Sequence, residues 1–250
     1  MHARGGGPVA LLGSGEFEPW SDELDLALLR EATGDGSVAI LPTASAPEGE
    51  TYAEWAQMGL DHYARLGIPA RVVELKGRED SERGDLARQL ERASLTFLSG
   101  GHPSYLARVL GGSRVWATIA ASVERGGGYA GCSAGACIAG EYAPDSMTEH
   151  VWEDRWVSGL RLLPNTWIIP HFDALDSHRP GLRDFFLSRV PPTGWAIGID
   201  ERTALARLQG EWRVFGEGGV LIRRGDDSIR ASADEIVRLD VAPVAAPVLD

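Results

Sequence analysis

The chain has 250 residues, 44% of them hydrophobic and 24% charged, which is the composition of a folded globular protein and excludes a disordered chain. Its formal net charge of −12 argues against nucleic-acid and anionic-membrane partners, because a field of that sign repels phosphate groups. No apolar run approaches the ~20 residues that span a bilayer. Two cysteines are too few for a disulfide framework, so we expect a protein of the reducing cytoplasm.

Short apolar runs alternate with longer amphipathic segments through the first 140 residues. Runs bounded by Gly or Pro are typical of buried parallel strands, and the longer segments carry helix start and stop signals. This alternation predicts an α/β fold with a mostly parallel, doubly wound sheet and helices on both faces. The expected strands are 8–13, 37–42, 70–75, 95–99 and 128–132, and the expected helices are 21–32, 52–66 and 84–93.

The pattern changes after about residue 140. Residues 141–166 are acidic, contain tryptophan and show no clear period. Closely spaced short strands follow them, which predicts an antiparallel C-terminal extension of the same sheet. Because no long linker interrupts the chain, we predict one domain over residues 8–240, with loose termini at 1–7 and 241–250. The expected elements of this half are strands at 167–170, 195–199, 203–208 and 219–223 and a helix near 181–189.

The segment GCSAG at residues 131–135 carries the strongest local signal for chemistry. It follows an apolar strand and precedes a stretch of small residues that can begin a helix. A strand, a sharp turn and a helix form the context of a nucleophile elbow, in which the central serine projects beyond the strand end. Ser133 is therefore the candidate nucleophile, and Cys132 is interpreted as a buried strand residue. The alternative is a chance match in a chain with 31 glycines.

A serine nucleophile needs a base and an oxyanion hole. His171 follows a strand-like run, where a loop at the carboxyl edge of the sheet would bring it near Ser133. His178 is a weaker candidate for the base. The backbone N–H groups of Ala134, at the start of a helix, and of Gly101, at the end of a strand, are the candidate oxyanion donors.

The base in turn needs an acid that orients it. Asp200 and Glu201 end an expected strand, and only one of them can face His171 because neighbouring strand residues point to opposite faces. Glu149 or Asp145, in the segment before the histidine, is the other candidate acid. We favour Glu201, because a strand end places a carboxylate more rigidly than an irregular segment does.

Four motifs in this order resemble the dipeptidase E and cyanophycinase family of serine peptidases. They are LTFLSGGHPSYL (95–106), GCSAGA (131–136), IIPHF (168–172) and GIDERTAL (198–205). The early segments VALLGSGEF (9–17) and VAILPTASAP (38–47) are similar to the first strands of that family, so the resemblance runs from about residue 8 to 225.

The resemblance implies a class I glutamine amidotransferase-like fold. It also implies a serine exopeptidase or dipeptidase that hydrolyses small, Asp-containing peptides through an acyl-enzyme. By position, Ser133 would be the nucleophile, His171 the base and Glu201 the acid. Glu149 would lie near the family's other proposed charge-relay acid, and Gly101 and Ala134 would form the oxyanion hole.

The sequence departs from the family at two positions near the motifs. His102 stands where family members commonly have asparagine, close to the substrate's acidic group, so we expect a looser preference for aspartate. Pro170 precedes His171 where cyanophycinases have glutamine. Arg179 and Arg183 are candidates for binding a substrate carboxylate, because guanidinium groups match carboxylates bidentately. Helix-surface arginines that balance an acidic protein are the alternative.

Other functions remain open at the level of sequence: an α/β-hydrolase esterase, a cyanophycinase-like hydrolase of an Asp-Arg polymer, and a binding protein in which the elbow is a relic. No HExxH motif and no paired cysteine and histidine cluster occur, so we expect no metal and no cofactor. The expected partner is a small peptide substrate, without nucleic acid or membrane. A homodimer is one option for the oligomeric state.

Overall fold

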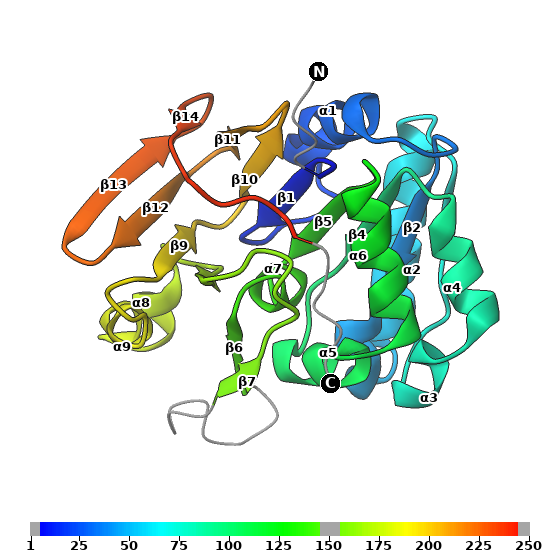
Figure 1. Cartoon of the computed structure of the whole chain (residues 1–250), viewed down its shortest axis with the longest axis horizontal. Helices are drawn as coiled ribbons and strands as arrows, with labels where there is room; N and C mark the ends of the chain where they lie inside the picture. Colours follow the sequence, from blue (N-terminus) through cyan, green and yellow to red (C-terminus); the bar gives the residue numbers. More distant parts are fainter. Residues whose placement is uncertain (1–5, 146–155, 245–250) are drawn as a thin grey trace.

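The computed structural model describes residues 6–145 and 156–244, and an eight-stranded sheet lies at its centre (Figure 1). Its strands are β1 (Val9–Leu12), β2 (Val38–Leu41), β3 (Ala70–Val72), β4 (Leu95–Leu98), β5 (Gly128–Cys132), β10 (Thr203–Leu208), β11 (Glu211–Gly216) and β14 (Ile236–Val237). Their order is β14-β11-β10-β1-β5-β4-β2-β3. The five strands from β1 to β3 in that order are parallel, and β10 and β11 extend the sheet antiparallel beyond β1.

Helices cover both faces of the parallel strands. In β1, Val9 and Leu11 belong to one buried apolar cluster, while Ala10 and Leu12 belong to another on the opposite face. The second cluster includes residues of α1 (Asp22–Glu31) and α2 (Thr51–Arg65). The first includes residues of α4 (Gly84–Glu91), α5 (Pro103–Leu110), α6 (Arg114–Glu124) and α7 (Ala134–Ile138). The predicted doubly wound α/β fold is confirmed.

A second sheet of four strands corrects the prediction of one continuous extension. Its strands are β8 (Thr166–Ile169), β9 (Trp195–Ile199), β12 (Gly219–Arg224) and β13 (Asp227–Ser232), in the order β13-β12-β9-β8. Of the strands expected to extend the main sheet, only β10 does so. Asp200 contributes to this pairing, because its carboxylate accepts the Gly219 N–H at 2.9 Å where the end of β9 meets the start of β12.

A small third core attaches two short helices to the second sheet. Ile169 and Phe172 pack there with Leu175, Leu182 and Phe186 from α8 (Leu175–His178) and α9 (Leu182–Ser188). Nearby, β6 (Tyr142–Pro144) pairs antiparallel with β7 (Trp156–Ser158). The remaining short helices are η1 (Pro19–Ser21), η2 (Thr43–Glu48) and α3 (Arg78–Ser81).

None of the helices in the described residues is both long and apolar enough to cross a membrane. The extent of the domain, residues 8–240, stays a prediction.

We predict that Tyr129→Phe lowers the free energy of unfolding by about 1–3 kcal/mol, because it leaves a buried carbonyl without this donor. The Tyr129 hydroxyl on β5 donates to the Gly135 carbonyl in α7 at 2.7 Å, and both groups are buried. Urea unfolding measures the change. Tyr105→Phe is the matched control, since its hydroxyl donates to the Lys76 carbonyl in an exposed setting. Equal stability of the two variants would contradict the prediction.

Candidate active site

Ser133 lies in the sharp turn between β5 and α7. Its backbone adopts φ +46° and ψ −103°, a strained conformation for a residue with a side chain. The flanking glycines make this turn sterically possible. A Cβ on Gly131 would lie 2.5 Å from the Gly135 carbonyl, and a Cβ on Gly135 would lie 2.3 Å from the Leu98 carbonyl oxygen. The elbow therefore depends on close backbone contact between α7 and the strands beneath it.

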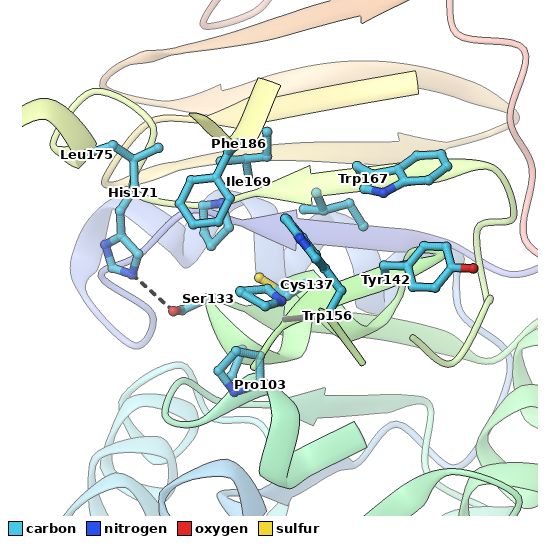
Figure 2. Close-up of a pocket in the computed structure, with 14 residues that line it drawn as sticks. Pro103, Ser133, Cys137, Tyr142, Trp156, Trp167, Ile169, His171, Leu175 and Phe186 are labelled. Carbon is cyan, nitrogen blue, oxygen red and sulfur yellow. Dashed lines mark hydrogen bonds between the residues drawn. The ribbon is translucent and has the colours of Figure 1, made fainter. Parts of the chain in front are cut away.

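The structure brings Ser133, His171 and Glu201 into one hydrogen-bonded chain. Ser133 Oγ lies 3.0 Å from His171 Nε2, as Figure 2 shows, and His171 Nδ1 lies 3.0 Å from Glu201 Oε1. The histidine follows β8 and the glutamate follows β9, and these strands are parallel neighbours. Their carboxyl ends therefore meet at one edge, which is where ligands bind in open α/β sheets.

Asp173 is a residue of this site that the sequence analysis missed. Its Oδ1 accepts the backbone N–H of Glu201 at 2.9 Å, so it holds the turn that carries the acid. A carboxylate two residues after His171 is a weak sequence signal for this supporting role, because Glu201 lies 28 residues further along the chain.

The two candidate oxyanion donors come from the elbow itself, at Ala134, and from the loop after the neighbouring strand β4, at Gly101. Ala134 is the first residue of α7, so its N–H has no acceptor within the helix. Gly101 has φ +132°, and a Cβ there would lie 2.4 Å from the Ala44 backbone. The N–H of the preceding Gly100 is taken, because it donates to Glu16 Oε1 at 2.8 Å. Of the glycine pair, Gly101 is therefore the one left to serve as a donor.

Glu16 is a second residue that the sequence analysis missed. It is only 3% exposed, and its Oε2 accepts the Cys132 thiol at 2.8 Å while its Oε1 accepts the Gly100 N–H. The Glu16 side chain therefore links Cys132, which precedes the candidate nucleophile, to Gly100, which precedes the candidate oxyanion glycine. The signal in the sequence was an acidic residue four positions after the end of the buried strand β1, within GSGEF.

Cys132 has the character of a buried strand residue. Burial raises the pKa of its thiol well above the usual value, and the neighbouring Glu16 raises it further. Burial also raises the pKa of the Cys137 thiol, to about 12. Both groups are thiols at neutral pH, and a thiol is a poor nucleophile compared with a thiolate.

The other acids considered from the sequence have different surroundings. Asp200 is buried and accepts from Arg230 and from the Gly219 N–H, on the side of its strand away from His171. Asp145 pairs with Arg108 at 2.8 Å. Glu149 lies outside the described residues.

Two of the three cations expected near a substrate carboxylate lie beside carboxylates of the chain itself. His102 precedes α5, and its Nε2 lies 3.3 Å from Glu48 Oε1. Arg183 stacks over the Phe172 ring at 5.1 Å and lies 3.5 Å from Asp176 Oδ2. Arg179, which follows α8, is exposed. The structure does not bring these three side chains to the Ser133 hydroxyl.

A cavity of about 130 Å³ opens beside Ser133 and His171. Its described walls come from α5, α7, β8, α8, α9 and the β6–β7 pair (Figure 2). Apolar and aromatic side chains dominate the lining, among them Tyr142, Trp156, Trp167, Ile169, Leu175 and Phe186. Over residues 6–145 and 156–244, no group of three or more His, Cys, Asp or Glu side chains is arranged to hold a metal ion.

Comparison with known families shows which protein family the chain belongs to. Residues 9–214 match the sequence model of peptidase family S51, which is most of the chain. The chain belongs to this family. The resemblance to the dipeptidase E and cyanophycinase family is therefore confirmed.

Solved structures and curated relatives agree with the family. A peptidase from an acI-B1 Actinobacterium is 30% identical, with a TM-score of 0.85 over 94% of this chain and 97% of that one. A putative peptidase E protein from Listeria monocytogenes EGD-e has the same fold, at 18% identity and a TM-score of 0.59 over 92% of this chain and 100% of that one. Cyanophycinases from Trichormus variabilis and Nostoc sp. are each 29% identical over 206 residues, 77% of this chain. The chain spans 65% of the length of these cyanophycinases.

We predict that Glu16→Ala slows the reaction of Ser133 with a fluorophosphonate by about 10- to 100-fold, because Gly100 loses its acceptor and the oxyanion glycine is no longer held in place. Glu16→Gln should recover part of the rate, since an amide oxygen can still accept the Gly100 N–H. The second-order labelling rate is the measurement, with circular dichroism as a check on folding.

Glu18→Gln is the matched control for this prediction. Glu18 lies two residues away and pairs with Arg202 at 3.1 Å, so its loss should leave labelling near the wild-type rate. Wild-type labelling in the Glu16→Ala variant would remove Glu16 from the site.

We predict that neither cysteine of the folded protein reacts with Ellman's reagent at pH 8, because burial keeps both thiols protonated and inaccessible. In guanidinium chloride, both cysteines should react, since unfolding restores their ordinary pKa. Rapid reaction of one thiol in the native protein would contradict the burial of Cys132 or Cys137.

Proposed function

We propose that this chain is a serine peptidase that hydrolyses small peptides through an acyl-enzyme on Ser133. The hydrogen-bonded chain from Ser133 Oγ to His171 Nε2 and from His171 Nδ1 to Glu201 Oε1, with both distances 3.0 Å, carries the proposal. Membership of peptidase family S51 supports a peptidase, and the strained backbone of Ser133 supports a nucleophile at this position.

In the first half of the reaction, Ser133 Oγ attacks the carbonyl carbon of the scissile bond while His171 Nε2 accepts the hydroxyl proton. The Glu201 carboxylate accepts a hydrogen bond from His171 Nδ1–H and stays ionised, which fixes the tautomer and stabilises the imidazolium that forms. Negative charge develops on the carbonyl oxygen between the N–H groups of Gly101 and Ala134. His171 then gives its proton to the leaving amine, the C–N bond breaks, and an ester to Ser133 remains.

In the second half, His171 accepts a proton from water, and the resulting hydroxide equivalent attacks the ester carbonyl. The same two N–H groups stabilise the second oxyanion. Return of the proton to Ser133 Oγ releases the acid product and restores the enzyme.

Two other hydrolases are weaker candidates. An α/β-hydrolase esterase would share the elbow, but the family match and the 30% identical peptidase both favour a peptidase. A cyanophycinase-like activity on an Asp-Arg polymer finds support in the two cyanophycinase relatives. However, Pro170 departs from the cyanophycinase pattern, in which glutamine precedes the histidine.

A cytoplasmic location is part of the proposal. Cys132 and Cys137 are both free and buried, which suits a reducing compartment.

We predict that a fluorophosphonate labels wild-type protein on Ser133 and that Ser133→Ala removes both the label and dipeptide hydrolysis, by several orders of magnitude in rate. Intact-mass spectrometry measures the label, and amine release from a dipeptide panel measures turnover. A p-nitrophenyl ester in the same assay separates peptidase from esterase. Ser228→Ala is the matched control, since Ser228 is an exposed serine of β13. Hydrolysis by the Ser133→Ala variant within tenfold of wild type would overturn the proposal.

A further inference from the structure

The cavity beside Ser133 is bounded by four aromatic side chains from four different elements. Tyr142 of β6 and Trp167 of β8 lie with ring centroids 5.9 Å apart. Trp156 of β7 meets Phe186 of α9 edge to face, at 5.8 Å and 85°. In Figure 2, Ser133 and His171 lie at one end of the cavity, and Tyr142 and Trp167 lie at the other.

The dimensions of the cavity match one apolar side chain. Its volume is about 130 Å³. An apolar cavity of about 150 Å³ in another protein binds benzene, so a space of this size accepts an aromatic ring or a branched aliphatic group. Trp167 is 8% exposed and Phe186 is 9% exposed, so these walls are held by packing and not by solvent-exposed loops.

The charges around the cavity disfavour an acidic side chain. Among the described lining residues, His171 is the one that can carry a positive charge, and it is paired with Glu201. Burying a carboxylate in this space would be costly, because it would lose its water and the one candidate cation among the described lining residues, His171, is already paired with Glu201. The nearest expected cation, His102, does not line the cavity and lies beside Glu48.

We propose that this cavity is a specificity pocket that selects a large apolar side chain, aromatic or branched aliphatic, on a residue flanking the scissile bond. The inference depends on the serine peptidase function proposed above. Because the cavity reaches both Ser133 and His171, the side chain belongs either to the residue whose carbonyl is attacked or to the leaving residue. The chemistry is the same in both cases, and the substrates below distinguish them.

The first experiment compares kcat/KM for the dipeptides Phe-Ala, Ala-Phe, Ala-Ala and Asp-Ala with the wild-type protein. We expect one of the two Phe peptides to exceed Ala-Ala by about 10- to 100-fold, because burying the ring is favourable and Ala leaves the pocket empty. Asp-Ala should not exceed Ala-Ala. A preference for Phe-Ala assigns the pocket to the acyl side, and a preference for Ala-Phe assigns it to the leaving side. Cleavage of Asp-Ala at or above the rate of both Phe peptides would overturn the inference and leave the peptidase function intact.

The second experiment replaces an aromatic side chain that lines the cavity. Trp156→Ala should lower the ratio of kcat/KM for the preferred Phe peptide to kcat/KM for Ala-Ala about tenfold, mainly through a higher KM for the Phe peptide. Trp195→Ala is the matched control: Trp195 is a half-buried tryptophan with Arg224 stacked on it at 5.0 Å, and it does not line the cavity. Equal effects of the two variants on the ratio of Phe to Ala peptides would overturn the inference.

A third measurement separates failure of the pocket from failure of the peptidase. The Ser133→Ala variant binds peptide without turnover, and Trp156 and Trp167 should report occupancy through their fluorescence. We expect tighter binding of the preferred Phe peptide than of Asp-Ala, by at least about tenfold. If wild type neither cleaves peptides nor takes the label, the proposed function fails, and this binding result still decides the pocket: equal or weaker binding of the Phe peptides overturns it.

Discussion

Close contact between α7 and strands β4 and β5 is the constraint on which the rest of the site depends. Gly131 and Gly135 let the backbones approach to distances that a Cβ would block, and the Tyr129 hydroxyl bonds the helix to the strand that precedes it. This contact holds Ser133 in its strained conformation and directs the Ala134 N–H toward the same space. A looser helix would lose the nucleophile and the oxyanion donor together, because both belong to one turn.

The site is assembled from two sheets, so its geometry depends on how they meet. Ser133 and Gly101, the candidate oxyanion glycine, follow strands of the large sheet. Glu16 accepts hydrogen bonds from Cys132 and Gly100, the residues that precede these two. The small sheet supplies His171 and Glu201 on parallel neighbours. At the turn between the sheets, Asp200 binds Gly219 and Arg230 on one side while Glu201 faces His171 on the other. Two neighbouring acids in the turn after β9 thus have different roles: Asp200 stabilises the fold and Glu201 contacts His171.

Sequence reasoning predicted features formed by residues that are contiguous in the chain, and it missed contacts between residues that are far apart in the chain. The strand 128–132 was predicted with the bounds of β5, and Ser133 was recognised there because strand, turn and helix are contiguous in the chain. Glu16 was missed because its partner Cys132 lies 116 residues away, and no local pattern connects the two. The second sheet was missed because strand spacing along the chain does not show that β9 pairs with β8 and β12 and not with β10, the strand that follows it. The interaction of Arg183 with Asp176 was also missed: Asp176 lies seven residues before Arg183 and accepts its backbone N–H.

The aromatic walls of the cavity illustrate why substrate preference cannot be derived from motifs alone. The motif residues fix the chemistry at one end of the cavity, whereas Trp156, Trp167 and Phe186 lie outside the motifs, Trp156 in a segment with no clear period. These walls belong to both sides of the junction: Pro103 and Cys137 pack from the large sheet's side, and Ile169 and Leu175 from the small sheet's side. An apolar side chain seated between them would contact both sides at once and hold the Ser133 hydroxyl against His171. Substrate binding and alignment of the reacting groups would then draw on the same apolar contacts, which is how binding energy is converted into positioning.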